Sequence, residues 1–341
     1  MKNFEYSQIS ELVDRSNLII VTSHHNPDGD AIGSAFALAS FLRRKGKEAF
    51  AMVPNDYPAF LKWIPGNNLI VVYRDETQKA INLLSKADLI FCVDYNALNR
   101  TEAMEPELRK ASAKKVLIDH HLEPELKEFD FYLSEIQTSS TSELVYAFAE
   151  GCGWLSLLDQ QIATGLFIGI MTDTGSFSFA CNYPATFRIT AGLIQAGIDV
   201  EQIHRQVYDT YSESRLRLLG FCLSEKLTIL PEYSAAYISL SISDLNRFHY
   251  QVGDTEGIVN YALSIGSVKM AILLTERKDR IRLSFRSKGN LAVNSIARMY
   301  FSGGGHRNAA GGDSFVSLDE TIRQLKDILA QYKEEIDRSS F

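Results

Sequence analysis

Histidine and aspartate side chains follow directly after apolar segments at four separate places in this sequence. These places are His24–Asp30 (HHNPDGD) after Asn17–Ser23, Asp94 after Asp88–Val93, Asp119–His121 (DHH) after Lys114–Ile118, and Asp173 after the apolar stretch 161–171. Carboxylates and imidazoles transfer protons and bind divalent cations. If the fold brings these groups together, they repel and desolvate one another unless a cation neutralises them. The sequence therefore predicts a metal site.

Each of these motifs also has an ordinary structural explanation when it is taken alone. Asp30 suits the cap of the helix that follows it, Asp94 suits a turn at a strand end, and pairs of histidines occur in ordinary loops. The combination of all four motifs favours a metal. Carboxylates with fewer imidazoles and no thiolate suit Mn²⁺, Fe²⁺ or Co²⁺ better than structural zinc, and so many carboxylates fit two ions that share a bridging aspartate.

The first half of the chain alternates apolar strands with amphipathic helices, which must position these groups. The predicted strands are Asn17–Ser23, Glu48–Val53, Leu69–Tyr73, Asp88–Val93 and Lys114–Ile118, with helices that include Ala31–Lys45 and Glu76–Lys86. Continuous apolar runs of this kind indicate a parallel sheet that is buried on both faces. The predicted fold class is α/β, with an N-terminal doubly wound, mainly parallel sheet. Ligands of such sheets bind beyond the carboxyl ends of the strands, where the motifs fall.

The middle of the chain is mainly helical, and a second α/β pattern begins near residue 227. The predicted helices are two within 139–171, where Gly165 and Gly169 are spaced for close packing, and then Pro184–Gly197 and Ser212–Lys226. The later strands are Leu227–Leu230, Ser234–Leu240, Lys269–Thr275 and Arg280–Arg286, with helices Asp254–Leu263, Leu291–Tyr300 and Leu318–Tyr332. This pattern predicts a smaller C-terminal α/β domain with a mixed sheet.

Charge and hydropathy limit the partners. Lys and Arg total 35 and Asp and Glu total 42, so the net charge is −7. A protein that coats long nucleic acid needs a basic surface, so that class is excluded, whereas a local pocket for a small anion is not. The start of the chain is acidic where a signal peptide is basic, and the apolar stretches are shorter than the ~20 residues of a membrane helix. We expect a cytoplasmic protein with no membrane partner.

Five motifs, in order along the chain, resemble those of the DHH phosphoesterase superfamily. They are SHHNPDGDAIGS (Ser23–Ser34), VDYN (Val93–Asn96), DHH (Asp119–His121), TDTGSF (Thr172–Phe177) and, for the DHH-associated second domain, GGGHRNAAGG (Gly303–Gly312). The pairing looks most like the NrnA-type nanoRNase/pAp-phosphatase branch. This resemblance implies a catalytic metal-binding DHH domain over 1–195, a helical linker over 196–226 and a substrate-binding domain over 227–341, with the active site in the cleft between the domains.

The resemblance also implies a role for each residue of the metal site. The implied metal ligands are His24, Asp28, Asp30, Asp94, His120 and Asp173. His24 and Asp28 would hold the first ion. Asp30, His120 and Asp173 would hold the second ion, and Asp94 would bridge both. His25 fills a variable position of the motif.

Two neighbours of the ligand His120 receive roles by the same resemblance. Asp119 would act behind the ligands, where it orients an imidazole or a loop. His121 would face the substrate phosphate. The residues expected to take part directly in catalysis are Asp28, Asp94, His120 and His121.

Basic and glycine-rich segments of the second domain are expected to bind phosphate. Residues 277–288 (RKDRIRLSFRSK) hold six basic side chains and one acid. The alternation of Arg280 and Arg282 with other residues is typical of a solvated edge strand. By resemblance, Arg286 would grip phosphate bidentately. The loop Ser302–Gly312 would let backbone amides approach a phosphate. Its expected contacts are Gly304, Gly305, His306 and Asn308.

The implied activity is hydrolysis of phosphate esters by a hydroxide that two divalent cations activate. We expect Mn²⁺, with Mg²⁺, Co²⁺ and Fe²⁺ as alternatives. The implied substrates are short RNA or DNA oligonucleotides and mononucleotide bisphosphates, including the 3′-phosphate of adenosine 3′,5′-bisphosphate (pAp). Ser176 departs from the basic residue of many branch members, which leaves the substrate preference open. The oligomeric state is also open, with a homodimer as one alternative.

Rival functions are weighed on the same motifs. Cyclic-di-AMP or linear dinucleotide (pApA) phosphodiesterases share them, so this alternative stays open. Pyrophosphatases are usually shorter and have a different phosphate-binding tail, and RecJ-type exonucleases carry an extra domain for which this chain is too short. A non-enzymatic nucleotide-binding module predicts lost ligands, yet every matched ligand position is filled.

Overall fold

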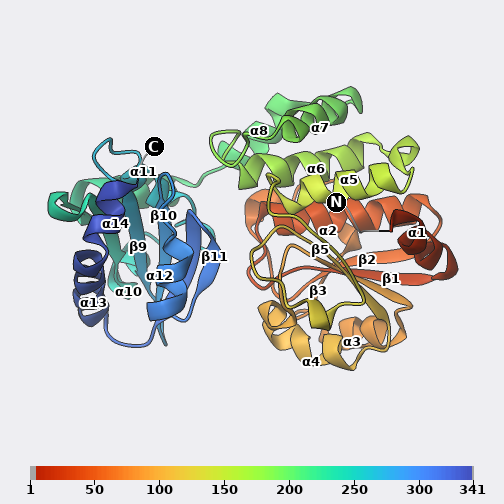
Figure 1. Cartoon of the computed structure of the whole chain (residues 1–341), viewed down its shortest axis with the longest axis horizontal. Helices are drawn as coiled ribbons and strands as arrows, with labels where there is room; N and C mark the ends of the chain where they lie inside the picture. Colours follow the sequence, from red (N-terminus) through yellow and green to blue (C-terminus); the bar gives the residue numbers. More distant parts are fainter. Residues whose placement is uncertain (1–4, 340–341) are drawn as a thin grey trace. The chain divides into compact units, whose positions relative to one another are not determined.

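The computed structural model describes residues 5–339, which form two compact units (Figure 1). The first unit ends at Thr210 and the second begins at Tyr211. The predicted helical linker, 196–226, is divided between them: Ile203 packs in the core of the first unit and Leu218 in a core of the second.

The first unit contains a six-stranded sheet in the order β3-β2-β1-β4-β5-β6, and every neighbouring pair is parallel. Its strands are β1 (Leu18–Thr22), β2 (Glu48–Val53), β3 (Ile70–Val72), β4 (Leu89–Val93), β5 (Lys114–Asp119) and β6 (Phe131–Ser134). The predicted doubly wound parallel sheet is confirmed. β6 was not among the predicted strands: its apolar run, Phe131–Leu133, is only three residues long, and one of the three, Tyr132, is exposed.

Helices cover both faces of this sheet (Figure 1). On one side lie α2 (Gly29–Arg44), α5 (Thr141–Gly151) and α6 (Gln160–Asp173), and on the other lie α3 (Thr77–Lys86) and α4 (Glu105–Lys110). The alternation of side chains along β1 explains both layers: Ile19 and Val21 enter the first core, whereas Ile20 enters the second. The unit also contains α1 (Tyr6–Arg15), α7 (Pro184–Gln195) and α8 (Val200–Tyr208).

Close packing of α2 against α6 fixes two ends of the candidate site. A Cβ atom on Gly33 would lie 2.4 Å from the carbonyl oxygen of Gly165, and one on Gly169 would lie 2.5 Å from Oδ1 of Asp30. Only glycine allows the backbones to come this near, as the spacing of Gly165 and Gly169 predicted. The start of α2, which carries Asp30, therefore lies beside the last turns of α6, which ends at Asp173.

The second unit contains a mixed sheet in the order β11-β12-β10-β9-β8-β7. Its strands are β7 (Leu227–Leu230), β8 (Ala235–Leu240), β9 (Met270–Glu276), β10 (Ile281–Ser287), β11 (Gly304–His306) and β12 (Ala309–Ser314). β8 and β9 are parallel, and the other neighbouring pairs are antiparallel. The predicted smaller α/β domain with a mixed sheet is confirmed.

Two apolar cores flank this second sheet. One core holds α12 (Val293–Tyr300), α13 (Leu318–Gln331) and α14 (Lys333–Arg338), and the other holds α9 (Glu213–Phe221), α10 (Ile242–Arg247) and α11 (Ile258–Leu263). The second core draws on β8 and β9, including Ile238 and Leu273. Across the described part of the chain, every helix is too short or too polar to cross a membrane.

Candidate metal centre

The carboxyl ends of β1, β4 and β5 carry the predicted site residues of the first unit. β1 leads through His24 and Asp28 into α2, β4 ends directly before Asp94, and β5 ends at Asp119. Because these strands are adjacent and parallel, their ends meet at one edge of the sheet. The structure therefore brings together groups that lie up to 149 positions apart, from His24 to Asp173.

Asp94 lies at the centre of the cluster. One of its oxygens, Oδ2, is 3.5 Å from Nε2 of His24, and the other, Oδ1, is 3.5 Å from Nε2 of His120. Donor atoms of His24, Asp28 and Asp94 lie within 4.8 Å of one another, and so do those of Asp30, Asp94 and His120. A third potential group joins Asp94 with Asp119 and His121, so all three of these groups share Asp94. Asp94 has a left-handed backbone (φ 65°).

Asp30 is buried against the N-terminus of α5. Its Oδ2 accepts the backbone N–H of Thr141 at 2.6 Å, and its Oδ1 accepts that of Ser142 at 2.9 Å. Burial nevertheless raises the pKa of Asp30 to about 7, with a further contribution from the charge of Asp28. Burial, followed by the charges of Asp30 and Asp28, also holds the pKa of Asp94 well above its ordinary value. For both carboxyl groups, the contributions that raise the pKa outweigh the hydrogen bonds from Thr141 and Ser142 that lower it.

His24 and Asp28 form the more exposed side of the cluster. Asp28 caps α2, since its Oδ1 accepts the backbone N–H groups of Asp30 and Ala31, and its side chain is 48% exposed. Nδ1 of His24 lies 2.9 Å from the carbonyl oxygen of His25. That contact fixes the ring so that Nε2 faces the carboxylates, as expected for an imidazole ligand. The ring of His25 lies outside the cluster, 3.1 Å from Oε1 of Glu102.

His120 connects the strand cluster to the end of α6. Its Nε2 lies 3.5 Å from Oδ2 of Asp173 and 3.9 Å from Oδ2 of Asp30. One imidazole nitrogen therefore faces carboxylates from β4, α2 and α6. All six predicted ligands lie around Asp94 and His120. Their roles as metal ligands stay a prediction.

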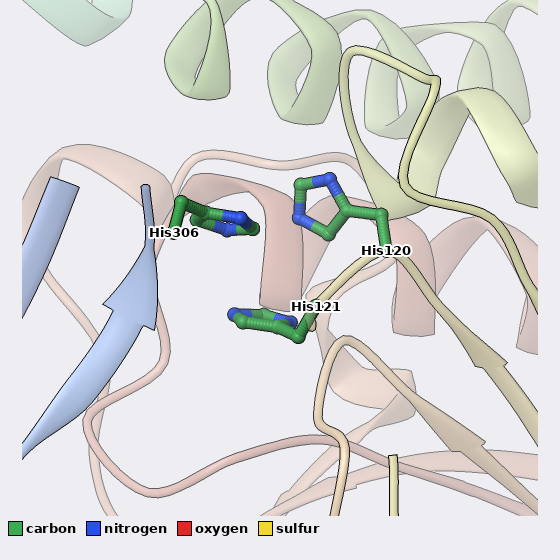
Figure 2. Close-up of side chains that lie close together, drawn as sticks. All are labelled: His120, His121 and His306. Atoms are coloured by element: carbon green, nitrogen blue, oxygen red, sulfur yellow. The ribbon is translucent and has the colours of Figure 1, made fainter. Parts of the chain in front are cut away.

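The ring of His121 lies near that of His120 (Figure 2), but it contacts a different carboxylate. Its Nδ1 lies 2.7 Å from Oδ1 of Asp119, which itself is fully buried, and its ring stands nearly perpendicular to that of His120 at 5.1 Å between centroids. Burial, followed by the positive charge of Arg100, lowers the pKa of His121 to about 3. His121 is therefore neutral near pH 7, and the tautomer with its proton on Nδ1 would donate to Asp119 and leave Nε2 as a hydrogen-bond acceptor.

Sequence reasoning missed two residues of this site. Thr141, the first residue of α5, donates its hydroxyl to Oδ1 of Asp94 at 2.9 Å. Arg100 acts on His121 from the segment after β4, and its carbonyl oxygen accepts the N–H of His25 at 2.8 Å. The run SSTSE at 139–143 signals a cap and could have drawn attention to Thr141, whereas a lone arginine carries no such signal.

Two of the predicted phosphate-binding residues of the second unit, Arg286 and His306, share one face of its sheet. Arg286, Ala309 and His306 lie directly opposite one another on β10, β12 and β11. Residues paired in this way point to the same face, so Arg286 and His306 flank the small side chain of Ala309. Asn308 instead uses its Nδ2 within the unit, where it donates to Ser287 Oγ and to the carbonyl of Gly289, both at 2.9 Å.

Two expectations for the second unit are wrong. The segment around residues 304–314 is a β-hairpin rather than a loop, and three of its glycines permit close backbone packing: a Cβ on Gly303, Gly305 or Gly312 would lie 2.0–2.8 Å from atoms of the protein. Around a Cβ on Gly304 the space within 4 Å is open. β10 is an interior strand between β12 and β9, so its arginines do not protect a sheet edge.

The fold and this cluster define a two-domain α/β protein with a carboxylate and imidazole centre at the carboxyl edge of a parallel sheet. The model of the DHH family, N-terminal domain, matches residues 18–170, and that of the DHHA1 domain matches residues 234–336. The chain belongs to the DHH family.

Known proteins resemble the chain over nearly its whole length. An exopolyphosphatase-related protein from Bacteroides fragilis has a structure with a TM-score of 0.94 and 38% identity, covering 99% of this chain and 100% of that one. Bifunctional oligoribonuclease and PAP phosphatase NrnA is 28% identical in Thermus thermophilus (95% of this chain, 91% of that one) and 29% identical in Bacillus subtilis (96% and 99%).

More distant relatives share the fold. RecJ from Thermus thermophilus, solved in complex with Mn²⁺, matches with a TM-score of 0.54 and 13% identity, over 97% of this chain and 55% of that one. Cyclic-di-AMP phosphodiesterase GdpP from Bacillus subtilis is 26% identical, and this chain spans 49% of its length.

Proposed function

We propose that this protein is a metal-dependent phosphoesterase that hydrolyses short oligonucleotides and the 3′-phosphate of adenosine 3′,5′-bisphosphate. The observation that carries the proposal is that Asp94 belongs both to a group of potential ligands with His24 and Asp28 and to a group with Asp30 and His120. The substrate class comes from the NrnA relatives, which match nearly the full chain.

The donor set fits a pair of divalent cations. Buried carboxylates with raised pKa values are poorly compensated by the protein, and a cation would stabilise their charged form. The proposed ligands of one ion are His24, Asp28 and Asp94, and those of the other are Asp30, Asp94, His120 and Asp173. Oxygen ligands with few imidazoles favour Mn²⁺ or Mg²⁺. When bound, such ions activate water and neutralise charge on a phosphate.

The remaining residues are proposed to contact the phosphate. Asp119 fixes the ring of His121 by a contact at Nδ1, and His121 is proposed to face the substrate phosphate. In the second unit, Arg286 and His306 offer donors to phosphate oxygens on either side of Ala309. The net charge of −7 agrees with short substrates rather than long nucleic acid.

One assay with resolved products tests this proposal. The protein with Mn²⁺ is offered pAp, pApA, cyclic di-AMP, a short RNA and pyrophosphate side by side. We expect turnover of pAp and the short RNA, and a loss of at least ~100-fold in Asp94→Asn and His120→Asn. The matched controls are Asp75→Asn and His249→Asn, which change the same residue types at exposed positions.

The outcomes separate the alternatives. Unchanged turnover in both site variants contradicts the metal mechanism. Dominant cleavage of cyclic di-AMP identifies the activity named for the GdpP relatives, and dominant cleavage of pyrophosphate overturns the proposed substrate class.

A further inference from the structure

The charged face of β10 has no protective role, because β10 pairs with a strand on each side. Its apolar residues, Ile281, Leu283 and Phe285, enter the core that α12 and α13 cover. The alternate residues, including Arg282 and Arg286, lie on the opposite face. These arginines therefore need an explanation other than blocking the pairing of a sheet edge.

The strands beside β10 place small residues next to these arginines. Ser284 of β10 pairs with Gly311 of β12, which in turn pairs with Gly304 of β11. A Cβ atom on Gly311 would lie 2.8 Å from Nη2 of Arg282, so the guanidinium extends over this glycine. The guanidinium of Arg282 therefore lies level with Ser284, the next residue on this face of β10 before Arg286. Neighbouring residues on one face of a strand are about 7 Å apart.

The charge at this place is only partly balanced. Arg280 and Arg282 both contact Oδ1 of Asp313, at 3.7 and 3.3 Å. One carboxylate cannot neutralise two guanidinium groups, and the side chain of Arg282 is 49% exposed. A surplus of positive charge therefore lies over a floor of glycines, where an anion can approach the backbone closely.

We propose that Arg282 binds a second phosphate of the substrate, one nucleoside away from the phosphate that contacts Arg286. This inference rests on the proposed function, since it concerns how the same substrate is held. The distance between the Arg282 guanidinium and the position of Arg286 along β10 is comparable to the spacing of neighbouring phosphates in a single-stranded nucleic acid. Substrates with two phosphates, such as pAp and pApA, would use both arginines, whereas 3′-AMP and ApA would use one.

A cycle that removes either the arginine or the substrate phosphate tests the proposal. We compare wild type and Arg282→Gln on pApA against ApA and on pAp against 3′-AMP, with kcat/KM as the readout. The variant should lose about 10- to 100-fold on the two-phosphate substrates and under about 3-fold on their one-phosphate partners. Arg282→Lys should recover part of the loss, because it keeps the charge without the bidentate geometry. Arg323→Gln, an exposed ion-paired arginine of α13, is the matched control.

Equal losses on both members of each pair, or no loss at all, would overturn the role of Arg282. Equilibrium binding of pAp and 3′-AMP to wild type and Arg282→Gln, measured in EDTA, supplies a readout that does not need turnover. If the wild-type protein binds pAp but hydrolyses no substrate, the proposed function fails while the binding role of Arg282 stands. If it binds pAp no more tightly than 3′-AMP, or if the variant keeps the preference, the inference fails.

Discussion

Thr141 donates its side-chain hydroxyl to Oδ1 of Asp94 at 2.9 Å, while its backbone N–H donates to Oδ2 of Asp30 at 2.6 Å. The first residue of α5 therefore ties together two of the proposed metal ligands, one after β4 and one at the start of α2. Both contacts favour the charged carboxylates, against the effect of burial. The N-terminus of α5 carries partial positive charge, which also favours the charged carboxylates.

Replacing Thr141 by valine should weaken metal binding. The change keeps the shape of the side chain but removes the donor to Asp94, so the pKa of Asp94 rises further and a proton competes more strongly with the cation. We expect Mn²⁺ affinity at pH 7, measured by calorimetric titration, to fall about 2- to 10-fold. Thr164→Val is the control, since that buried hydroxyl donates only to the carbonyl of Gln160. Equal Mn²⁺ affinity in Thr141→Val and wild type would contradict this account.

The metal-free protein should lose stability as the pH rises from about 4 to about 7. Burial raises the pKa of Asp30 from 3.8 to about 7, so the folded protein holds this proton more tightly than the unfolded chain does. Unfolding then releases a proton in this range, and a higher pH favours unfolding. The contribution of Asp30 is fully present below pH 4, declines up to about pH 7 and is constant above it, with a slope of at most ~1.4 kcal/mol per pH unit.

Urea unfolding in EDTA between pH 4.5 and 7.5 measures this effect. Other carboxylates also titrate in this interval, so the informative quantity is the difference in slope between wild type and Asp30→Asn. The variant should have the flatter profile. A profile of the same slope in both proteins would show that Asp30 does not hold the proton.

The loop after α6 should become more stable when one serine is replaced by glycine. Gly175, Ser176 and Phe177 are three consecutive residues with left-handed backbones, at φ 53°, 57° and 62°. This conformation costs an L-residue such as serine about 1 kcal/mol, a cost that glycine avoids. Ser176→Gly should therefore raise the free energy of unfolding by about 0.5–1 kcal/mol, as measured in urea. In Ser178→Gly, where φ is not positive, the same change should lower it, and a reversed order of the two variants would contradict the argument.

The sequence predicts the clustering of the proposed metal ligands better than it predicts the arrangement of the proposed phosphate-binding residues. Asp94 and His120 each follow an apolar strand, and parallel strands must deliver their carboxyl ends to one edge. No such rule applies to residues 303–312, where glycines that serve a ligand and glycines that serve packing look the same in sequence. The hairpin became recognisable only from the pairing of Gly305 with Ala310 and of Gly304 with Gly311.

Thr141 and Arg282 show a second limit of sequence reasoning. The role of Thr141 depends on contacts with residues 111 and 47 positions away, which local pattern does not encode. The alternation of Arg282 with apolar neighbours is the same for an edge strand and an interior strand. Only the strand order separates the two interpretations.

The adjacent residues Gly304 and Gly305 should respond in opposite ways to alanine. A Cβ on Gly305 would lie 2.6 Å from the carbonyl oxygen of Ala309, and its φ of 136° is unfavourable for alanine, so Gly305→Ala should lower the free energy of unfolding by about 2 kcal/mol. The position of Gly304 is open, so Gly304→Ala should change it by less than about 0.5 kcal/mol. If Gly304 lies against a phosphate, its variant should bind pAp more weakly while it unfolds at the wild-type urea concentration. Wild-type affinity for pAp in Gly304→Ala would remove Gly304 from the phosphate-binding face, and wild-type stability in Gly305→Ala would contradict the close packing of the hairpin.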